Sequence, residues 1–432
     1  MVPTLEQRTI RKVSWRLLPL IVVIYFVAYI DRTNVGFAAL TMNKDLGLSA
    51  YVFGWGAGIF FLGYFFFEVP SNVILEKTGA RIWIARIMVT WGLVSGAMAF
   101  ATGPASFLTL RFLLGVAEAG FFPGMILYFT YWFPKAYRAR VISALFIAVP
   151  GSNALASVIS GAILEMNGIL GLAGWQWMFV IEAVPSVLLA FAVLAFMTDR
   201  PARATWLSPE ERDWLETTLQ DERRRIESAG HINLARALTD RRVLTLSAIY
   251  FTIVTATYGI TFFLPQIVKG IGLSNVMTGL VTAVPYTIGM LMWGASSDRR
   301  DERRWHFCTA SLLAAAGLVG AGLFGSSFLA IAFMSAATVG LYGSKPAFWP
   351  MPSTFLTGTA AAGGIALVNS IGNLGGYVGP FVVGWIKDST GSFEAGLYFL
   401  AACALASGII AYFAVQPTER TKAPSGLAVP AR

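Results

Sequence analysis

The chain has 432 residues, of which 56% are hydrophobic and only 13% are charged. Soluble domains carry about 25% charged residues, and the charges here fall in blocks between long apolar runs, so the composition excludes an ordinary soluble protein. The formal net charge of +9 does not indicate a nucleic-acid partner, because most of it lies in short loops on one side of the expected helices.

Apolar runs of about 20 residues, the length that a helix needs to cross a bilayer, recur along the whole chain. They predict an all-α integral membrane protein with twelve transmembrane helices. We expect an N-terminal six-helix half (1–197), a polar linker (198–243) and a C-terminal six-helix half (244–432). The expected spans are 17–37, 51–75, 82–102, 105–132, 140–164, 176–197, 244–268, 276–296, 306–325, 327–353, 361–387 and 394–415.

Lysine and arginine are concentrated in the segment before the first span, in the linker, and in the loops after the second, fourth and eighth spans. The opposite loops hold only Lys44, Lys269 and Lys387. The positive-inside rule then places both termini and the linker in the cytoplasm, as in a multi-pass protein of the plasma (inner) membrane. The basic N-terminus is like a signal peptide, but no small-residue cleavage site follows it, so we expect an uncleaved first helix.

The linker contains one expected helix. Ser208, Pro209 and Glu211 form a capping-box pattern with proline in the first turn, and apolar residues follow at helical spacing to about residue 227. We interpret this helix as a connector that packs on the cytoplasmic ends of the two halves. A docking site for a partner protein is the alternative.

Asp31 and Arg32 interrupt the first apolar run, inside a helix that must span the membrane. Each charge costs roughly 2.5–3.5 kcal/mol at the centre of such a helix, so ionisable residues there usually have a function. Adjacent residues point about 100° apart on a helix. One of the two can therefore face a cavity while the other faces a neighbouring helix.

Arg111 and Glu118 lie seven residues apart in the fourth span, on one helix face and about 10.5 Å apart along the axis. Gly115 between them leaves room for a substrate or a neighbouring helix. Together with Asp31 and Arg32 they form the expected functional core. A carboxyl whose arginine partner is engaged by a bound anion becomes free to take up a proton, which is a physical route to proton–anion coupling. The alternative is a pair of buried ion pairs that only fix helix packing.

Other residue types give no sign of an enzyme or a cofactor. The two cysteines, Cys308 and Cys403, are far apart, and the two histidines are isolated, so no metal site is expected. The glycine-rich stretches 54–58 and 372–379 lack the strand–turn–helix setting of nucleotide loops. We interpret them as close contacts between helices that let the halves rock.

Two loops at corresponding places in the halves look related. SNVILEKTGAR (71–81) follows the second span, and GASSDRRDERR (294–304) follows the eighth. Both resemble the cytoplasmic loop signature of the major facilitator superfamily, G-x-x-x-D-R-x-G-R-R, although the first has Ser or Asn for the leading Gly and Glu-Lys for Asp-Arg. With the twelve spans and the repeated halves, the resemblance implies the major facilitator fold. The implied gating-loop residues are Glu76, Arg81, Asp298 and Arg299.

Motifs in the spans resemble one family of that superfamily, the anion:cation symporters. They are DRTN (31–34), Tyr64 with EVPSN (68–72), RFLLGVAE (111–118) and FLTGTA (355–360) leading to NSIGNLGG (369–376). The resemblance implies proton-driven uptake of small organic carboxylates. It implies that Asp31 and Glu118 handle protons and that Arg111 couples them. It implies that substrate is bound by Arg32, which anchors a carboxylate, and by the cavity residues Tyr29, Tyr64, Trp349 and Asn369.

The chemistry of these residue types agrees with that reading. Arginine binds a carboxylate through a two-point fork, and Tyr and Asn offer donors to polyhydroxy substrates; Tyr29 and Tyr64 alone could also be ordinary interior aromatics. Lys345 lies on the helical face of Trp349. A second cation suits a second carboxylate, as in tartrate, and the alternative is a lysine that snorkels toward the interface. Glu68, beside Pro70, and Glu182 are interpreted as structural acids.

The sequence therefore predicts a proton-coupled symporter that imports a small organic carboxylate, tartrate-like or a sugar acid, by alternating access. Its partners would be the organic anion, protons and the lipid bilayer, and it would act as a monomer without nucleic acid or cofactor. A dianion needs at least three protons for net positive entry, whereas two titratable carboxyls give electroneutral import. The alternatives are an organic-anion exchanger or exporter on the same fold, and a non-transporting membrane receptor, for which no larger soluble domain is present.

Overall fold

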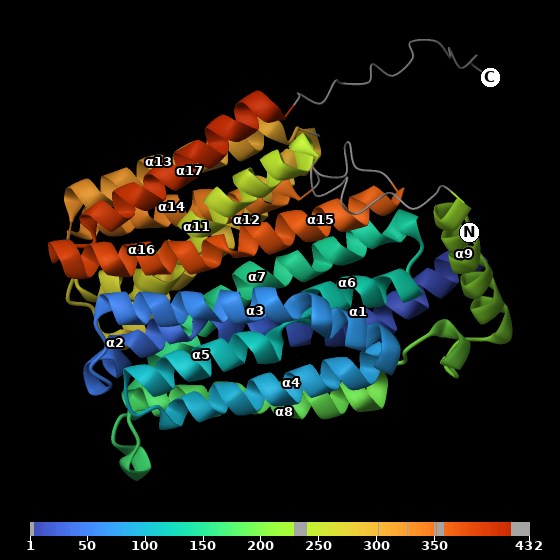
Figure 1. Ribbon diagram of the computed structural model, residues 1–432, viewed down its shortest axis with the longest axis horizontal. Helices are drawn as coiled ribbons and strands as arrows, with labels where there is room; N and C mark the ends of the chain where they lie inside the picture. Colours follow the sequence, from blue (N-terminus) through green and yellow to red (C-terminus); the bar gives the residue numbers. More distant parts are fainter. Residues whose placement is uncertain are drawn as a thin grey trace, which may run out of the picture.

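The computed structural model describes residues 4–228, 240–300, 302–325, 327–349, 351 and 358–415. Within these residues the regular secondary structure is helical, and the long helices run side by side along the longest axis of the molecule (Figure 1). The N-terminal helix group comprises α1 (Leu5–Thr33), α2 (Val35–Asp45), α3 (Ala50–Thr78), α4 (Ala80–Ala97), α5 (Pro104–Glu118), α6 (Phe121–Trp132), α7 (Lys135–Ile163) and α8 (Gly174–Phe196).

The linker carries α9 (Pro209–Ser228). The C-terminal helix group comprises α11 (Arg241–Lys269), α12 (Asn275–Arg300), α13 (Arg304–Phe324), α14 (Phe328–Phe348), α15 (Gly358–Asn373), α16 (Gly375–Thr390) and α17 (Glu394–Ala414). The two groups occupy the lower and upper parts of Figure 1, and they meet where α3 packs on α16 and α7 packs on α12.

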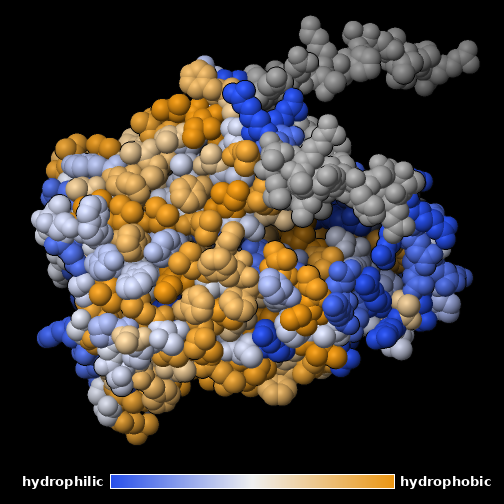
Figure 2. Space-filling view, viewed as in Figure 1, coloured by the Kyte–Doolittle hydropathy of each residue, from blue (hydrophilic) through white to orange (hydrophobic). Residues whose placement is uncertain are grey.

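The expected spans coincide with helices. Each of the twelve ranges contains one helix or two consecutive helices, although residues 350, 352 and 353 of the range 327–353 lie outside the described part. Nine segments of the described chain are long and apolar enough to cross a bilayer. Large apolar side chains such as Phe66, Leu188 and Phe413 are exposed, and Figure 2 shows apolar surface over much of the middle of the molecule. A soluble protein does not expose apolar surface on this scale, so these features show a multi-pass membrane protein.

One expected span is broken next to Glu118, a residue that the sequence predicts to handle protons. The range 105–132 forms α5 and α6, because Ala119 is extended and Gly120 is left-handed with φ of 84°. Only glycine adopts this conformation without strain, and a Cβ on Gly120 would also lie 2.4 Å from Ser71 Oγ. The break directly follows Glu118. The interruptions at Asn34, between α1 and α2, and at Leu374, between α15 and α16, are milder and keep right-handed helical dihedrals.

The helix of the linker forms as expected. The Ser208 hydroxyl accepts a hydrogen bond from Glu211 N at 3.2 Å, and Ser208 N donates to Glu211 Oε2 at 2.9 Å, which confirms the capping box. Arg8 and Lys12 of α1 pair with Glu211. These ion pairs attach α9 to the N-terminal helix group. We call the end of the bundle that holds α9 and the start of α1, on the right of Figure 1, the α9 end.

At the other end, the two helix groups are in close contact. A Cβ on Gly384 of α16 would lie 2.2 Å from the carbonyl oxygen of Ala50 in α3, and one on Gly279 of α12 would lie 2.2 Å from the carbonyl oxygen of Ser157 in α7. Gly54 meets the carbonyl of Pro380 in the same way. Gly54 belongs to the glycine-rich stretch 54–58, so its contact agrees with the close helix contacts that the sequence indicated. Together the three glycines bring the two groups together at this end of the bundle.

The loops expected to act in gating are described in part. Glu76 is exposed near the end of α3, and Arg81 N donates to Asp199 Oδ1 at 2.9 Å, which joins the start of α4 to the chain after α8. Asp298 and Arg299 lie in the last turn of α12, and their side chains fall outside the described part. Residues 229–239 of the linker and 355–357 of the FLTGTA motif also lie outside it.

Candidate functional site

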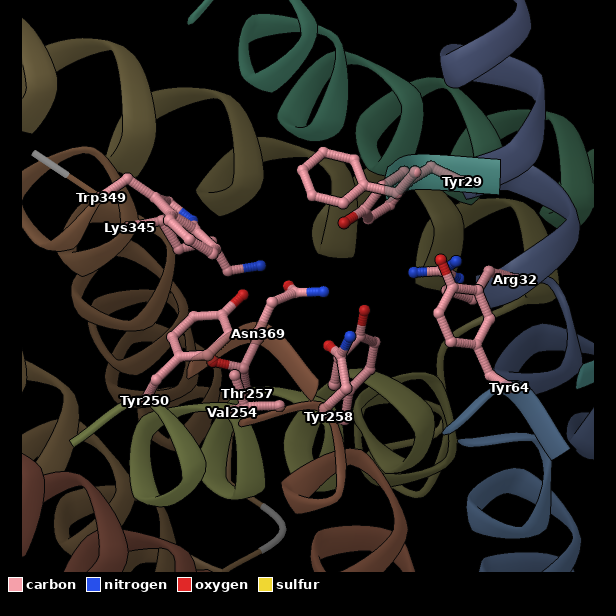
Figure 3. Close-up of a pocket in the computed structure, with 12 residues that line it drawn as sticks. Tyr29, Arg32, Tyr64, Tyr250, Val254, Thr257, Tyr258, Lys345, Trp349 and Asn369 are labelled. Carbon is pink, nitrogen blue, oxygen red and sulfur yellow. The ribbon is translucent and has the colours of Figure 1, made fainter. Parts of the chain in front are cut away.

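A cavity lies between the two helix groups (Figure 3). Its lining residues Tyr64 and Val254 lie near the middle of α3 and α11. The structure brings all six residues expected to bind substrate to its wall, although the sequence places them on α1, α3, α14 and α15 and just after α14. They are Tyr29, Arg32, Tyr64, Lys345, Trp349 and Asn369. Their shared location agrees with the prediction, and their role in binding remains a prediction.

Two cations face this cavity from opposite helix groups. Arg32 of α1 and Lys345 of α14 point toward each other across it in Figure 3. The Lys345 Nζ lies 4.5 Å from the centre of the Tyr342 ring, so the lysine is held by an aromatic face within the protein. This position favours the reading of Lys345 as a second cation of the cavity over a lysine that snorkels toward the interface.

Arg32 forms an ion pair with Glu118, whose side chain is 3% exposed. Because Glu118 is the last residue of α5, the break at Gly120 and this ion pair lie together. The guanidinium also lies 5.2 Å from the centre of the Tyr29 ring and 5.5 Å from that of Tyr64. Within the described residues, its Nε has no hydrogen-bond partner. Arg32 therefore keeps a donor in addition to the Nη2 that donates to Glu118.

Asp31 points away from the cavity. Its carboxylate accepts hydrogen bonds from Trp91 Nε1 at 2.9 Å and Ser95 Oγ at 3.1 Å on α4, and from Ser186 Oγ at 2.5 Å on α8. These are neutral donors, and no ion pair of Asp31 occurs in the described part of the chain. The divergence of Asp31 and Arg32 follows from their 100° separation on the helix.

Among the described residues, Arg111 forms an ion pair with neither Asp31 nor Glu118, and its coupling role remains a prediction. Its guanidinium is fully buried and donates to the carbonyl oxygens of Gly56 and Ala57 in α3, at 3.1 and 3.2 Å. A Cβ on Gly115 would lie 2.0 Å from the carbonyl oxygen of Phe60. The space beside Gly115 is thus filled by a neighbouring helix, α3, which is one of the two alternatives that the sequence left open.

The two acids interpreted as structural have different surroundings. Glu182 of α8 accepts a hydrogen bond from Ser160 Oγ at 2.7 Å, entirely within the N-terminal helix group. Glu68 of α3 accepts one from Ser370 Oγ at 3.0 Å, and Ser370 belongs to α15. The hydrogen bond of Glu68 therefore connects the two helix groups, whereas that of Glu182 connects two helices of the same group.

The remaining wall of the cavity was not expected from the sequence. It comes mostly from α11, through Tyr250, Val254, Thr257 and Tyr258. These residues lie on one face of a helix that is buried over most of its length. Their spacing of four and then three to four residues is a detectable signal. No charged residue lies between Tyr250 and Tyr258, however, so nothing in the sequence separates them from ordinary interior aromatics and threonines. Tyr250, Thr257 and Tyr258 add hydroxyl groups to the cavity wall.

Comparison with known proteins gives consistent results. A sequence model described as Major Facilitator Superfamily matches residues 21–362. A protein of Agrobacterium vitis with the provisional name of a tartrate transporter is 54% identical over 409 residues, which cover 94% of this chain and 91% of that protein. A protein of Acinetobacter baumannii named quinolone resistance transporter is 42% identical, with 96% of this chain and 97% of that protein covered.

Solved structures agree with the sequence matches on the fold. A bacterial homologue of the human lysosomal transporter Spinster, crystallised in an inward-facing and unoccupied conformation, superposes with a TM-score of 0.72. The superposition covers 94% of this chain and 95% of the other, with 17% sequence identity. At this identity the likeness concerns the fold alone.

Proposed function

Since the chain belongs to the Major Facilitator Superfamily and is a non-enzymatic membrane transporter, we propose that it is a proton-coupled symporter that imports a small organic carboxylate. The substrate class we propose is a tartrate-like dicarboxylate, with a sugar acid as the second member of the class. Transport would proceed by alternating access of residues 1–197 and 244–432, joined by the linker 198–243. The protein would act as a monomer in the plasma membrane with both termini cytoplasmic.

One observation carries this proposal: Arg32 and Lys345 face one cavity from different helix groups, and Arg32 is paired with the buried carboxylate of Glu118. A dicarboxylate can engage a cation of each group and so draw the groups together. Its hydroxyls would meet Tyr29, Tyr64 and Asn369, which offer hydrogen-bond donors and acceptors. The relative named as a tartrate transporter supports this substrate class.

Proton coupling would follow from competition for Arg32. A substrate carboxylate that takes the guanidinium weakens its ion pair with Glu118, and the buried Glu118 can then hold a proton instead of an uncompensated charge. Asp31 would be the second proton site, reached through the movement of α1. Arg111, held by the carbonyls of α3, would act on Glu118 through its charge and through the position of α5.

The contacts between the helix groups support alternating access. At the end opposite the α9 end, Gly384 and Gly279 lie against the backbone of the other group. There the Asp388 carboxylate of α16 accepts hydrogen bonds from Ala50 N at 3.0 Å and Tyr51 N at 2.9 Å, and so caps α3. A negative charge near a helix N-terminus is stabilising. Because Asp388 and α3 belong to different helix groups, this interaction would be lost when the groups separate. By the positive-inside rule, this closed end would be the external one.

The test is uptake of radiolabelled L-tartrate, meso-tartrate, galactonate and phthalate into proteoliposomes with an imposed pH gradient. Proton symport predicts that an inward proton gradient drives uptake in the wild type. Glu118→Gln should lose this response and keep exchange of labelled for unlabelled substrate. Uptake that ignores the gradient in the wild type, or that is unchanged in Glu118→Gln, would exclude the proton mechanism.

The second candidate function is export or exchange of an organic anion, which the relative named quinolone resistance transporter favours. An exchanger does not require Glu118 to release a proton. In the same proteoliposomes it would show substrate exchange of equal rate in the wild type and in Glu118→Gln, without net uptake in either.

A further inference from the structure

Glu68 is a buried carboxyl that the proposed mechanism does not use. It lies in the membrane-spanning helix α3 and is 6% exposed. Its Oε2 accepts a hydrogen bond from Ser370 Oγ of α15 at 3.0 Å. Within the described residues it forms no ion pair. A carboxyl at such a depth is costly and usually belongs to an ion or proton pathway.

Its position ties Glu68 to the cavity. Tyr64, one helical turn before it on the same face of α3, and Asn369, next to Ser370, both line the cavity wall. The groups that act on the Glu68 carboxyl are Arg32 from α1, the neutral side chains of Asn369 and Ser370 from α15, and the Tyr64 phenol of its own helix. From α5, Glu118 reaches the same neighbourhood through its ion pair with Arg32.

Glu68 also sits where the surroundings must change during transport. Its hydrogen-bond partner belongs to the other helix group, so movement of the groups makes and breaks this contact. A carboxyl takes up and releases a proton during a cycle only if its surroundings differ between the states. Glu182 provides the contrast, since its partner Ser160 lies in the same helix group and moves with it.

We propose that Glu68 is a third proton-binding site of the transport cycle, which binds or releases its proton as the contact with Ser370 opens and closes. This inference rests on the proposed proton symport. Its consequence is a change in charge balance. A dianion with two protons carries no net charge, and with a third proton on Glu68 it carries one positive charge inward. The membrane potential would then drive uptake of a dicarboxylate.

The test uses the full-length protein in proteoliposomes with L-tartrate, a dianion at pH 7, and a potential clamped by valinomycin. One inward positive charge per substrate predicts that 100 mV, inside negative, raises the limiting accumulation ratio of the wild type about 50-fold. Glu68→Gln, which keeps the shape and an acceptor for Ser370, should accumulate tartrate with the pH gradient alone and show no response to the potential. Exchange of labelled tartrate should persist in this variant, which shows that it is folded.

Glu182→Gln is the matched control, because it makes the same substitution at a buried acid that also accepts from a serine. It should keep the wild-type response to the potential. The inference is overturned if wild-type uptake is electroneutral, if Glu68→Gln responds to the potential as the wild type does, or if Glu68→Gln loses exchange. In each of these cases, uptake that still responds to the pH gradient in the wild type would leave the proposal of proton symport valid. Loss of the pH response in the wild type overturns both proposals.

Discussion

Arg32 and Lys345 face the same cavity from α1 and α14, two helices that belong to different helix groups. The two cations can therefore act on one ligand only when the helix groups approach each other around the cavity. A ligand with one carboxylate can satisfy Arg32 alone, whereas a ligand with two can satisfy both cations. This relationship connects the choice of substrate to the movement of the groups.

Lys345→Ala is expected to reduce tartrate transport more than galactonate transport. A hydrogen bond to a charged group contributes about 1.5–3 kcal/mol, so its loss should raise the KM for tartrate roughly 10- to 100-fold. Galactonate has one carboxylate, and its KM should change less. Initial uptake rates over a range of concentrations measure both values. Lys345→Arg, which keeps the positive charge, is the control, and an equal loss for the two substrates would contradict the assignment.

Gly384→Ala should shift the protein away from the state that is closed at the end opposite the α9 end. The new Cβ would lie 2.2 Å from the backbone carbonyl oxygen of Ala50, and neither backbone can move without separating α3 from α16. Distances between spin labels on the two helix groups at this end should lengthen. Gly151→Ala is the matched control, because its Cβ would meet only Phe26 at 3.7 Å. Unchanged distances in Gly384→Ala would show that this contact does not hold the end closed.

Asp388→Asn tests whether the charge of Asp388 at the N-terminus of α3 stabilises the same closed state. The substitution keeps an oxygen that can accept from Ala50 N or Tyr51 N, but it removes the negative charge at the N-terminus of α3. Such a charge contributes about 0.3–1 kcal/mol, so the population of the closed state should fall about two- to fivefold relative to the open state. Single-molecule fluorescence between the groups reports the populations. Glu394→Gln, in the first turn of α17, should leave them unchanged, and an equal effect of the two variants would point to a nonspecific cause.

The attachment of α9 should weaken in acid. Burial alone would raise the pKa of Glu211, but the hydrogen bond from Ser208 N and the charges of Lys12 and Arg8 outweigh it and hold the pKa below its ordinary value. Because its pKa is lowered, the Glu211 carboxylate stabilises the attached state at pH values above its ordinary pKa of about 4.3. This contribution is lost as the pH falls through the lowered pKa of the attached state.

Hydrogen exchange of the α9 amides measures this effect. Exchange in the wild type should accelerate as the pH falls below about 4, after correction for the intrinsic rate. Glu211→Gln should already exchange faster at pH 7 and should show a flatter pH dependence. A wild-type profile that runs parallel to that of Glu211→Gln would mean that this carboxylate does not hold the helix.

The sequence predicted the helix positions because a membrane span needs an apolar run of a certain length. Among the six cavity residues, the charges of Arg32 and Lys345 stood out within apolar runs. The other four (Tyr29, Tyr64, Trp349 and Asn369) were implied by the resemblance to the anion:cation symporters. It could not predict the partner of each charge. Spacing on one helix showed that Arg111 and Glu118 share a face, but the packing of α3 against Gly115 decides that Arg111 meets carbonyl oxygens. The face of α11 with Tyr250 and Tyr258 carries no charge, so only the fold reveals that it lines the cavity.

The break after Glu118 was missed for a related reason. An apolar run of 28 residues, 105–132, predicts one long helix, and a single Gly120 within it is compatible with a continuous helix. The structure shows why glycine is needed at this position, since Gly120 is left-handed and Ser71 of α3 occupies the space of a side chain. In the same way, the sequence could not distinguish Glu68 from Glu182, because each is a lone acid in an apolar span and only their partners differ.

The measurement that tests the central proposal most directly is the pH of a weakly buffered medium around proteoliposomes when L-tartrate is added without any imposed gradient. If the protein carries protons inward with tartrate, the medium should become more alkaline at the rate of tartrate uptake, and Glu118→Gln should abolish the change while it keeps exchange. Tartrate uptake without any change in external pH would contradict proton symport.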